Sequence, residues 1–222
     1  MKILLIADIH ANYHALRAVL DAFADVDETW FLGDVISYGW QPSQCLELVR
    51  RRCSKIIRGN HDLQCYGGSI TAGEQAYLAA LPAQMEIALN GTRYLLTHDV
   101  PGQKAYFTAA TAQAVFDTLL ASIEQDVVLC GHSHTAMLVE SGGKTLVNVG
   151  TVGQPRDGDP RAQCMLMQDG RFSFHRVAYD LDAMEADYRR LAPPGDEIES
   201  WIRWARQGMV DVHGLQRGPF SE

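Results

Sequence analysis

Short hydrophobic runs alternate with helix-like segments over the first 60 residues of the chain. Residues 2–7 form an almost continuous apolar run and predict a buried strand. A helix that Asn12 can cap is predicted next, because four apolar residues recur at helical spacing: Leu16, Val19, Leu20 and Phe23. Residues 29–32 and 55–57 predict two further strands, with a helix between them that opens at Pro42. This alternation is typical of a layered α/β sheet.

The middle of the chain changes from helix-like to hairpin-like patterns. Thr71 begins a capping-box sequence and predicts a short helix. Two strand-like runs then flank Asn90-Gly91, a dipeptide preferred in tight hairpin turns. Turn signals at 141–143 and 169–170 predict two more hairpins. Before them comes a helix whose apolar side is formed by Phe116, Leu119, Leu120 and Ile123. We therefore expect a second sheet.

The end of the chain predicts two helices separated by Pro193-Pro194-Gly195. No repeat or flexible linker interrupts the sequence. We expect a single domain over residues 1–222, with a core of residues 1–178 and a C-terminal helical extension of residues 179–222.

Composition and charge narrow the class of protein. With 47% hydrophobic and 21% charged residues, the 222-residue chain has the composition of a soluble globular protein. It has no apolar run long enough to span a bilayer, and we expect no membrane association. Its five cysteines include no C-x-x-C pair, which favours a reducing cytoplasm over a disulfide framework. The formal net charge of -8 disfavours binding of long nucleic acids.

Residues able to bind cations cluster directly after the predicted strands, and five of the eight histidines are among them. In α/β folds, the loops at strand ends assemble the active site. The clusters are Asp8-x-His10, Gly33-Asp34, Gly59-Asn60-His61-Asp62, His98-Asp99 and Gly131-His132-x-His134.

The types of ligand in these clusters indicate the kind of metal site. Carboxylate oxygen, amide oxygen and imidazole nitrogen together suit Mn²⁺, Fe or Zn²⁺ better than Mg²⁺. Cysteine ligands are missing from the clusters, which argues against a structural zinc site. The ligands are too many for one tetrahedral ion. Two ions about 3.5–4 Å apart, bridged by a carboxylate, would use them all and suit displacement at phosphorus.

The ordered motifs D-x-H, G-D, G-N-H-D, a single H after a strand, and G-H-x-H resemble those of the calcineurin-like metallophosphoesterase superfamily. Residues 8–12 and 150–161 look like the small bacterial and archaeal phosphodiesterases grouped with diadenosine tetraphosphatase, and the resemblance covers residues 1–178. It implies an α/β fold, a four-layer αββα sandwich of two mixed sheets flanked by helices. It also implies two divalent transition-metal ions per chain, with Mn²⁺ expected and Fe, Ni²⁺ or Zn²⁺ as alternatives.

The resemblance divides seven ligands between two ions. The first ion is bound by Asp8, His10 and His134. Asp34 bridges both ions, and the second ion is held by Asn60, His98 and His132.

The resemblance further implies a phosphoesterase that hydrolyses phosphodiesters or phosphomonoesters. Hydroxide between the metals attacks phosphorus, while His61, oriented by Asp62, donates a proton to the leaving oxygen. We expect small phosphorylated substrates, above all nucleotides. The alternatives are a binding scaffold, as in a retromer subunit of this fold, and a nuclease acting on long DNA. The complete ligand set disfavours the first and the acidic charge disfavours the second. The oligomeric state is left open.

Two candidate substrate contacts have a second interpretation. Asn12 either contacts phosphate or caps a helix. Arg156 either clamps phosphate, whose geometry guanidinium matches, or forms a buried salt bridge to Asp157 or Asp159.

Three other residues near the motifs are equally ambiguous. Tyr38 and Trp40 either wall a pocket that stacks a base or aryl group, or pack in the core. Asp99 stands where the family commonly has glycine, and it either contacts a metal-bound water or is a loop residue.

Overall fold

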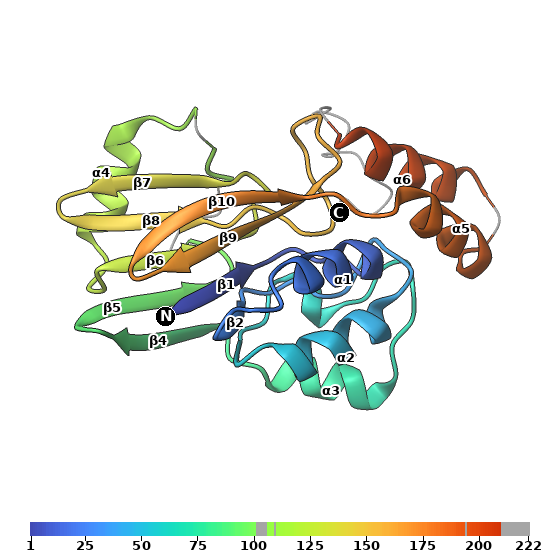
Figure 1. Ribbon diagram of the computed structural model, residues 1–222, viewed down its shortest axis with the longest axis horizontal. Helices are drawn as coiled ribbons and strands as arrows, with labels where there is room; N and C mark the ends of the chain where they lie inside the picture. The colour runs from blue at the N-terminus through green and yellow to red at the C-terminus, as the bar shows by residue number, and fades with distance from the viewer. Residues whose placement is uncertain (101–105, 109, 194, 210–222) are drawn as a thin grey trace.

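The computed structural model describes residues 1–100, 106–108, 110–193 and 195–209. Two five-stranded sheets account for the strands in this part of the chain (Figure 1). The first sheet has the order β10 (Arg171–Val177), β9 (Ala162–Gln168), β1 (Lys2–Ile6), β2 (Glu28–Phe31) and β3 (Lys55–Ile56). In it, β1 to β3 are parallel, whereas β9 pairs antiparallel with both β1 and β10.

The second sheet is also mixed. Its order is β4 (Gln84–Leu89), β5 (Thr92–Thr97), β6 (Val127–Cys130), β8 (Lys144–Asn148) and β7 (Met137–Ser141). The three central strands are parallel, and the edge strands β4 and β7 are antiparallel to their neighbours. The predicted hairpin at Asn90-Gly91 is confirmed, and both residues have the positive φ of such turns.

The predicted helix starts are confirmed by their caps. Asn12 accepts a hydrogen bond from the backbone of Ala15 and caps α1 (Tyr13–Ala22), and Pro42 is the first residue of α2 (Pro42–Arg52). Thr71 and Glu74 form the predicted capping box of α3 (Ala72–Ala80). The remaining helices are α4 (Gln113–Ala121), α5 (Leu181–Leu191), α6 (Asp196–Gln207) and the short 3₁₀ helix η1 (His61–Leu63).

Alternation along β1 shows how the layers form. Ile3 and Leu5 point into the core between the two sheets, whereas Leu4 and Ile6 pack under α1 and α2. Each of these side chains is fully buried, and burial of one contributes about 1.5–3 kcal/mol. On the far side of the second sheet, Leu146 packs with residues of α4. Helices thus cover both outer faces, as the predicted four-layer sandwich requires.

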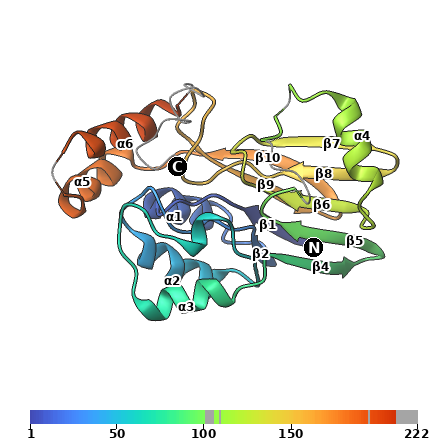
Figure 2. The same cartoon turned by 180° about the vertical axis from the view of Figure 1, so that it is seen from behind.

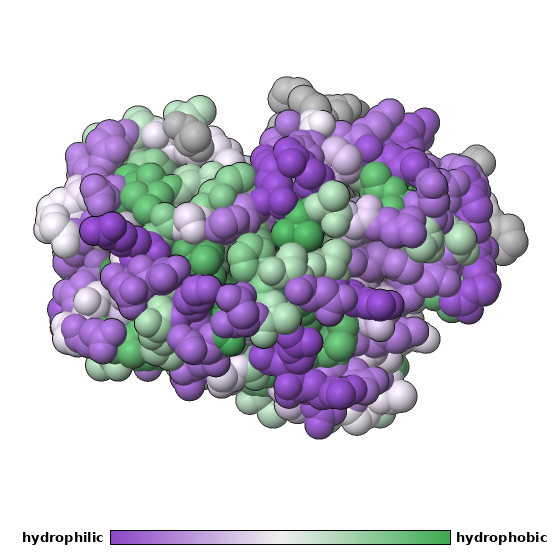
Figure 3. Space-filling model, in the orientation of Figure 1, coloured by the Kyte–Doolittle hydropathy of each residue, from purple (hydrophilic) through white to green (hydrophobic). Residues whose placement is uncertain are grey.

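The two C-terminal helices lie together at the end of the molecule opposite α4 (Figures 1 and 2). Their shared apolar cluster includes Met184, Tyr188 and Ile202, and Trp40 packs against it. The core-packing interpretation of Trp40 therefore holds. On the face drawn in Figure 3, hydrophilic residues cover most of these helices. Among the described residues, no helix combines the length and apolarity needed to cross a membrane.

Candidate metal centre

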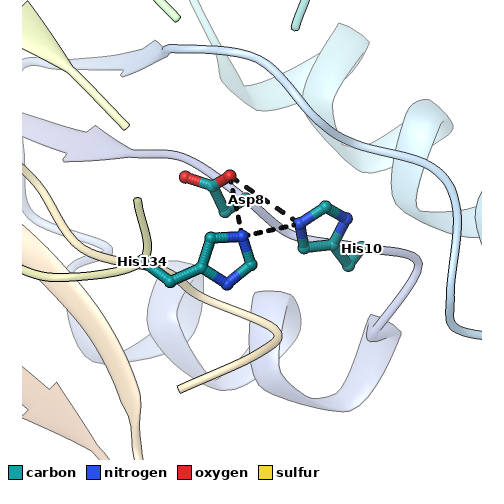
Figure 4. A group of neighbouring side chains, drawn as sticks. All are labelled: Asp8, His10 and His134. Atoms are coloured by element: carbon teal, nitrogen blue, oxygen red, sulfur yellow. Dashed lines mark hydrogen bonds and ion pairs between the residues drawn. The ribbon is translucent and has the colours of Figure 1, made fainter. Parts of the chain in front are cut away.

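Five of the predicted ligands meet where strands of both sheets end. Asp8 and His10 follow β1, Asp34 follows β2, His98 follows β5 and His134 follows β6. Ligand atoms of Asp8, His10 and His134 all lie within 4.8 Å of one another (Figure 4), as do those of Asp8, Asp34 and His98. These five residues are buried. Asp8 belongs to both groups, whereas the resemblance assigned the bridging position to Asp34.

The backbone at these positions is strained. Asp8, His10, Asp34, His132 and His134 have φ values of 52°, 49°, 64°, 68° and 57°. Residues with a Cβ seldom adopt these values, and they concentrate at functional sites. The loops therefore hold ligand side chains in directions that regular strand geometry would not allow.

Two motif glycines allow the carboxylates to approach the backbone closely. A Cβ on Gly131 would lie 2.5 Å from Asp8 Oδ2, and a Cβ on Gly59 would overlap Asp34 Oδ1. The glycine that opens G-N-H-D and the glycine that opens G-H-x-H are thus required by packing within the site.

Backbone carbonyls set the tautomers of three histidines. A carbonyl only accepts hydrogen bonds, so an Nδ1 atom bonded to one carries a proton and, in a neutral imidazole, leaves Nε2 with a free lone pair. This applies to His10 with Ile36 (3.3 Å), His98 with Leu32 (2.8 Å) and His134 with Gln154 (2.9 Å).

The resulting acceptors face one another without a donor between them. Nε2 of His10 lies 3.0 Å from Nε2 of His134, which in turn lies 3.2 Å from Asp8 Oδ1. Asp8 Oδ1 is buried and has no hydrogen-bond partner among the described residues. His98 Nε2 is buried 3.1 Å from Asp34 Oδ2, an acceptor to which it can donate only when it is protonated. A buried polar atom without a partner costs about 1–3 kcal/mol. A cation within each of the two groups of ligand atoms would satisfy these atoms, so the residues present fit metal ions.

The buried carboxylates of the site need a positive charge nearby to balance them. Burial alone would raise the pKa values of Asp8 and Asp34, but nearby imidazoles hold the pKa of Asp8 well below its ordinary value and lower that of Asp34 to about 2. Burial would lower the pKa of His98, yet the two carboxylates outweigh it and raise that pKa to about 10. A proton on His98 thus balances the carboxylates when no metal does, and a metal must displace it.

The other two predicted ligands lie on the solvent side of this cluster. Asn60 is exposed, His132 is half-buried, and Asn60 Oδ1 lies 3.1 Å from His132 Nδ1. The backbone N–H of His132 donates to Asp8 Oδ2 at 2.9 Å. The rings of His132 and His98 are 5.3 Å apart. Asp99 Oδ2 lies 4.0 Å from His132 Nε2, so the carboxylate at this unusual position borders the site.

The expected partnership of Asp62 with His61 is corrected by the structure. Both carboxylate oxygens of Asp62 accept backbone N–H groups, from Gly59, Asp34, Val35 and Ile36. The 3₁₀ turn directs this side chain inward, where burial and then the charge of Asp34 raise its pKa to about 6. The imidazole of His61 is bonded instead to Tyr38, with 3.0 Å between Nε2 and Oη. Asp62 therefore organises the loop backbone.

Asn12 is a structural residue. Its Oδ1 caps α1, and its Nδ2 donates to the carbonyl of Gly153 and to the hydroxyl of Tyr179, each at 3.2 Å. The side chain is buried. The cap interpretation is confirmed, and the contacts of the amide atoms within the protein favour a structural role over a substrate contact.

Arg156 forms no salt bridge of the kind considered from the sequence. Asp157 pairs with Arg176, and Asp159 pairs with Arg161 and Arg176. Within the described chain, Arg156 donates from Nη2 to Gln154 Oε1 at 3.0 Å, and its buried Nε has no partner. Burial lowers the pKa of this guanidinium. A cationic group without an anion therefore lies near the carboxylates of the metal centre.

Comparison with known proteins agrees with this geometry. The model of the calcineurin-like phosphoesterase superfamily domain matches residues 1–170. Phosphodiesterase YfcE of Escherichia coli is 27% identical over 186 residues, covering 76% of this chain and 89% of YfcE. A symmetrical bis(5'-nucleosyl)-tetraphosphatase of Erwinia tasmaniensis is 37% identical over 68 residues, 28% of this chain and 25% of that protein. A metallophosphoesterase structure from Sphaerobacter thermophilus has 29% identity and a TM-score of 0.78, covering 94% of this chain and 100% of that one.

Fold, site and comparisons together define a metal-dependent phosphoester hydrolase. The chain belongs to the calcineurin-like phosphoesterase superfamily.

Proposed function

We propose that this protein uses two divalent transition-metal ions to hydrolyse phosphodiester or phosphomonoester bonds of small phosphorylated molecules, nucleotides foremost. The observation that carries the proposal is the convergence of unprotonated Nε2 atoms on the buried oxygen of Asp8. The relatives support the reaction class by their names, a phosphodiesterase and a tetraphosphatase that acts on dinucleoside compounds.

The seven ligands would be shared between the two ions. Asp8, His10 and His134 would hold one, Asp34 would bridge, and the other would be held by Asn60, His98 and His132. When bound, the ions supply positive charge that polarises the phosphoryl group and acidifies water. Nitrogen and oxygen ligands together favour Mn²⁺, with Fe, Ni²⁺ or Zn²⁺ as alternatives.

In this proposal two side chains of the protein act on the substrate, and a third positions one of them. Arg156 binds a phosphate oxygen through its unpartnered N–H group, because guanidinium and phosphate form strong charged hydrogen bonds. His61 donates a proton to the leaving oxygen. Tyr38 keeps the His61 ring in position through their 3.0 Å contact.

All five cysteines are unpaired, which supports our placing the enzyme in the reducing cytoplasm.

The decisive experiment combines metal analysis with a substrate panel. Purified protein is stripped of metal, reloaded with Mn²⁺, Fe²⁺, Ni²⁺ or Zn²⁺, and tested on nucleotide and non-nucleotide phosphomonoesters and phosphodiesters. We expect about two ions per chain and metal-dependent hydrolysis. At most one ion after careful reloading, or no hydrolysis with any ion, would contradict the proposal.

Asp34→Asn tests the bridging position. The change removes a negative charge but keeps an oxygen that can accept the 2.8 Å hydrogen bond from the backbone of His61. We expect lower metal content at both sites and loss of turnover, with an unchanged circular dichroism spectrum. Unchanged activity would show that Asp34 is only a turn residue.

A further inference from the structure

A pocket opens beside the metal centre and extends under the C-terminal helix. His10, Tyr38 and Arg156 line one side, and Trp201, Trp204 and Met209 line the other. The first side carries the charged and hydrogen-bonding groups near the ligands. The second side is aromatic and apolar. The two sides therefore match a molecule with a phosphate at one end and a flat apolar group at the other.

The aromatic side is held firmly against the site. The ring of Trp201 lies 5.1 Å from that of Tyr38, and Trp204 meets Trp201 edge to face at 4.6 Å. Trp201 is buried, whereas Trp204 is half-buried. The apolar cluster shared with α5 fixes α6 in this place. Trp204 thus has ring surface available to a ligand, as has the half-buried Tyr38.

We propose that this pocket binds a flat aromatic substituent of the phosphate ester, an aryl group or a nucleobase, which stacks on Trp204 while Arg156 holds the phosphate. The inference rests on the proposed function and adds the substrate class that the site prefers. Residues 171–222 lie outside the matched family domain. The preference is therefore a property of the C-terminal extension, separate from the phosphoester chemistry of the shared core.

The pocket is narrow, with an interior of about 30 Å³. An aromatic ring does not fit into that volume unless a wall moves. Trp204 is a half-buried wall residue, and in this proposal it shifts outward to admit the ring that stacks on it. Binding of an aromatic ligand should consequently change the tryptophan fluorescence, and binding of an aliphatic ligand should not.

The test compares phenylphosphonate with methylphosphonate, which differ in the ring and resist hydrolysis. Both are titrated calorimetrically into Mn²⁺-loaded, full-length protein. We expect phenylphosphonate to bind about tenfold more tightly, the order that stacking on one aromatic side chain supplies. Trp204→Ala should remove this difference and leave methylphosphonate binding unchanged, and Trp204→Phe should retain most of it.

A second variant and a matched control complete the design. Ala205 lines the pocket, so Ala205→Phe should block it and remove the preference without deleting any packing. Arg203 is exposed on the same helix and is not a lining residue, so Arg203→Ala should keep the preference. Equal affinity for the two phosphonates in the unaltered protein, or a preference that survives both Trp204→Ala and Ala205→Phe, would overturn the proposal.

Two further ligands identify the source of the ring. If adenosine 5'-monophosphate binds more tightly than ribose 5-phosphate, and Trp204→Ala removes the difference, the pocket binds a nucleobase that is joined to the phosphate through a sugar. If only phenylphosphonate binds more tightly than its counterpart without a ring, the pocket binds the aryl group of an aryl ester. Failure of methylphosphonate itself to bind would count against the proposed phosphoesterase centre rather than against the pocket.

Discussion

Single hydrogen bonds decide which atoms of the site can bind a metal. His98 and His134 each donate an Nδ1 proton to a backbone carbonyl, which leaves Nε2 as the ligand atom. Single contacts also explain why Arg156 forms no salt bridge with Asp157 or Asp159. Both aspartates pair with Arg176 instead. At these residues, the hydrogen-bond and ion-pair partners decide which atoms can bind a ligand, and the residue type alone does not.

The role of His61 can be tested through the leaving group. An acid helps only when the departing oxygen is basic, so His61→Ala should lower kcat on alkyl and nucleoside esters by about 10²–10⁴-fold. A nitrophenyl ester leaves as a stabilised phenolate and should lose much less. Steady-state kinetics on both ester types, with metal content checked, gives the contrast. Equal losses would remove the general-acid role.

Arg156→Ala should raise KM more than it lowers kcat, if the side chain binds the phosphate equally strongly in the ground state and in the transition state. A hydrogen bond to a charged group contributes about 1.5–3 kcal/mol, so KM should rise by about tenfold or more. Arg161→Ala is the matched control, because that side chain is exposed and paired with Asp159. Reduced thermal stability without the kinetic change would contradict phosphate binding.

The pH dependence of the metal-free protein reports on His98. Its pKa is about 10 in the folded state and 6.5 in the absence of the fold. A raised pKa means that this stabilisation is fully present below pH 6.5 and is lost as the pH rises through 10. Thermal unfolding of metal-free protein should therefore shift to lower temperature between pH 7 and pH 10.

Metal should suppress this loss, because a bound ion keeps His98 unprotonated at every pH of the series. A His98→Asn variant should also lack it. If the unfolding temperature of the metal-free protein is the same from pH 7 to pH 10, protonated His98 does not balance the charge of the two carboxylates.

At the scale of elements, strand ends and helix starts bring the ligands together. β1, β2 and β3 are parallel, so the loops that follow them lie at one edge of their sheet. The loops after β5 and β6 bring His98 and His134 to the same place from the second sheet. Local caps then set where each helix begins.

Asn12→Ala tests one such cap. The change removes the cap of α1 and leaves the carbonyl of Gly153 without the amide donor, so the free energy of unfolding should fall by about 1–3 kcal/mol. KM for the substrate should change little. Urea denaturation and kinetics on one sample separate the two effects. A large rise in KM at unchanged stability would restore the phosphate-contact interpretation.

At the scale of the whole molecule, the two sheets and the extension each contribute part of the site. The first sheet supplies Asp8 and Asp34, the second supplies His98 and His134, and α6 supplies the aromatic wall with Trp201. The matched family domain ends at residue 170. The arrangement therefore separates a shared chemical centre from a wall that the extension contributes.

The sequence by itself determined the elements of this protein and which residues are candidate metal ligands. Strand alternation, the capping box at Thr71 and the turn at Asn90-Gly91 depend on residues within a few positions of each other, and the structure confirms them. The motifs at strand ends predicted the clustered ligands for the same reason, since parallel strands place their ends together.

Only the tertiary structure decided how those groups are used. No local pattern shows that His134 donates to Gln154, that Asp62 bonds to backbone groups of the loop after β2, or that Tyr38 contacts both His61 and Trp201. These contacts join segments far apart in the chain. Their existence depends on which distant groups packing brings within hydrogen-bond distance, and periodicity along the sequence carries no information about that distance.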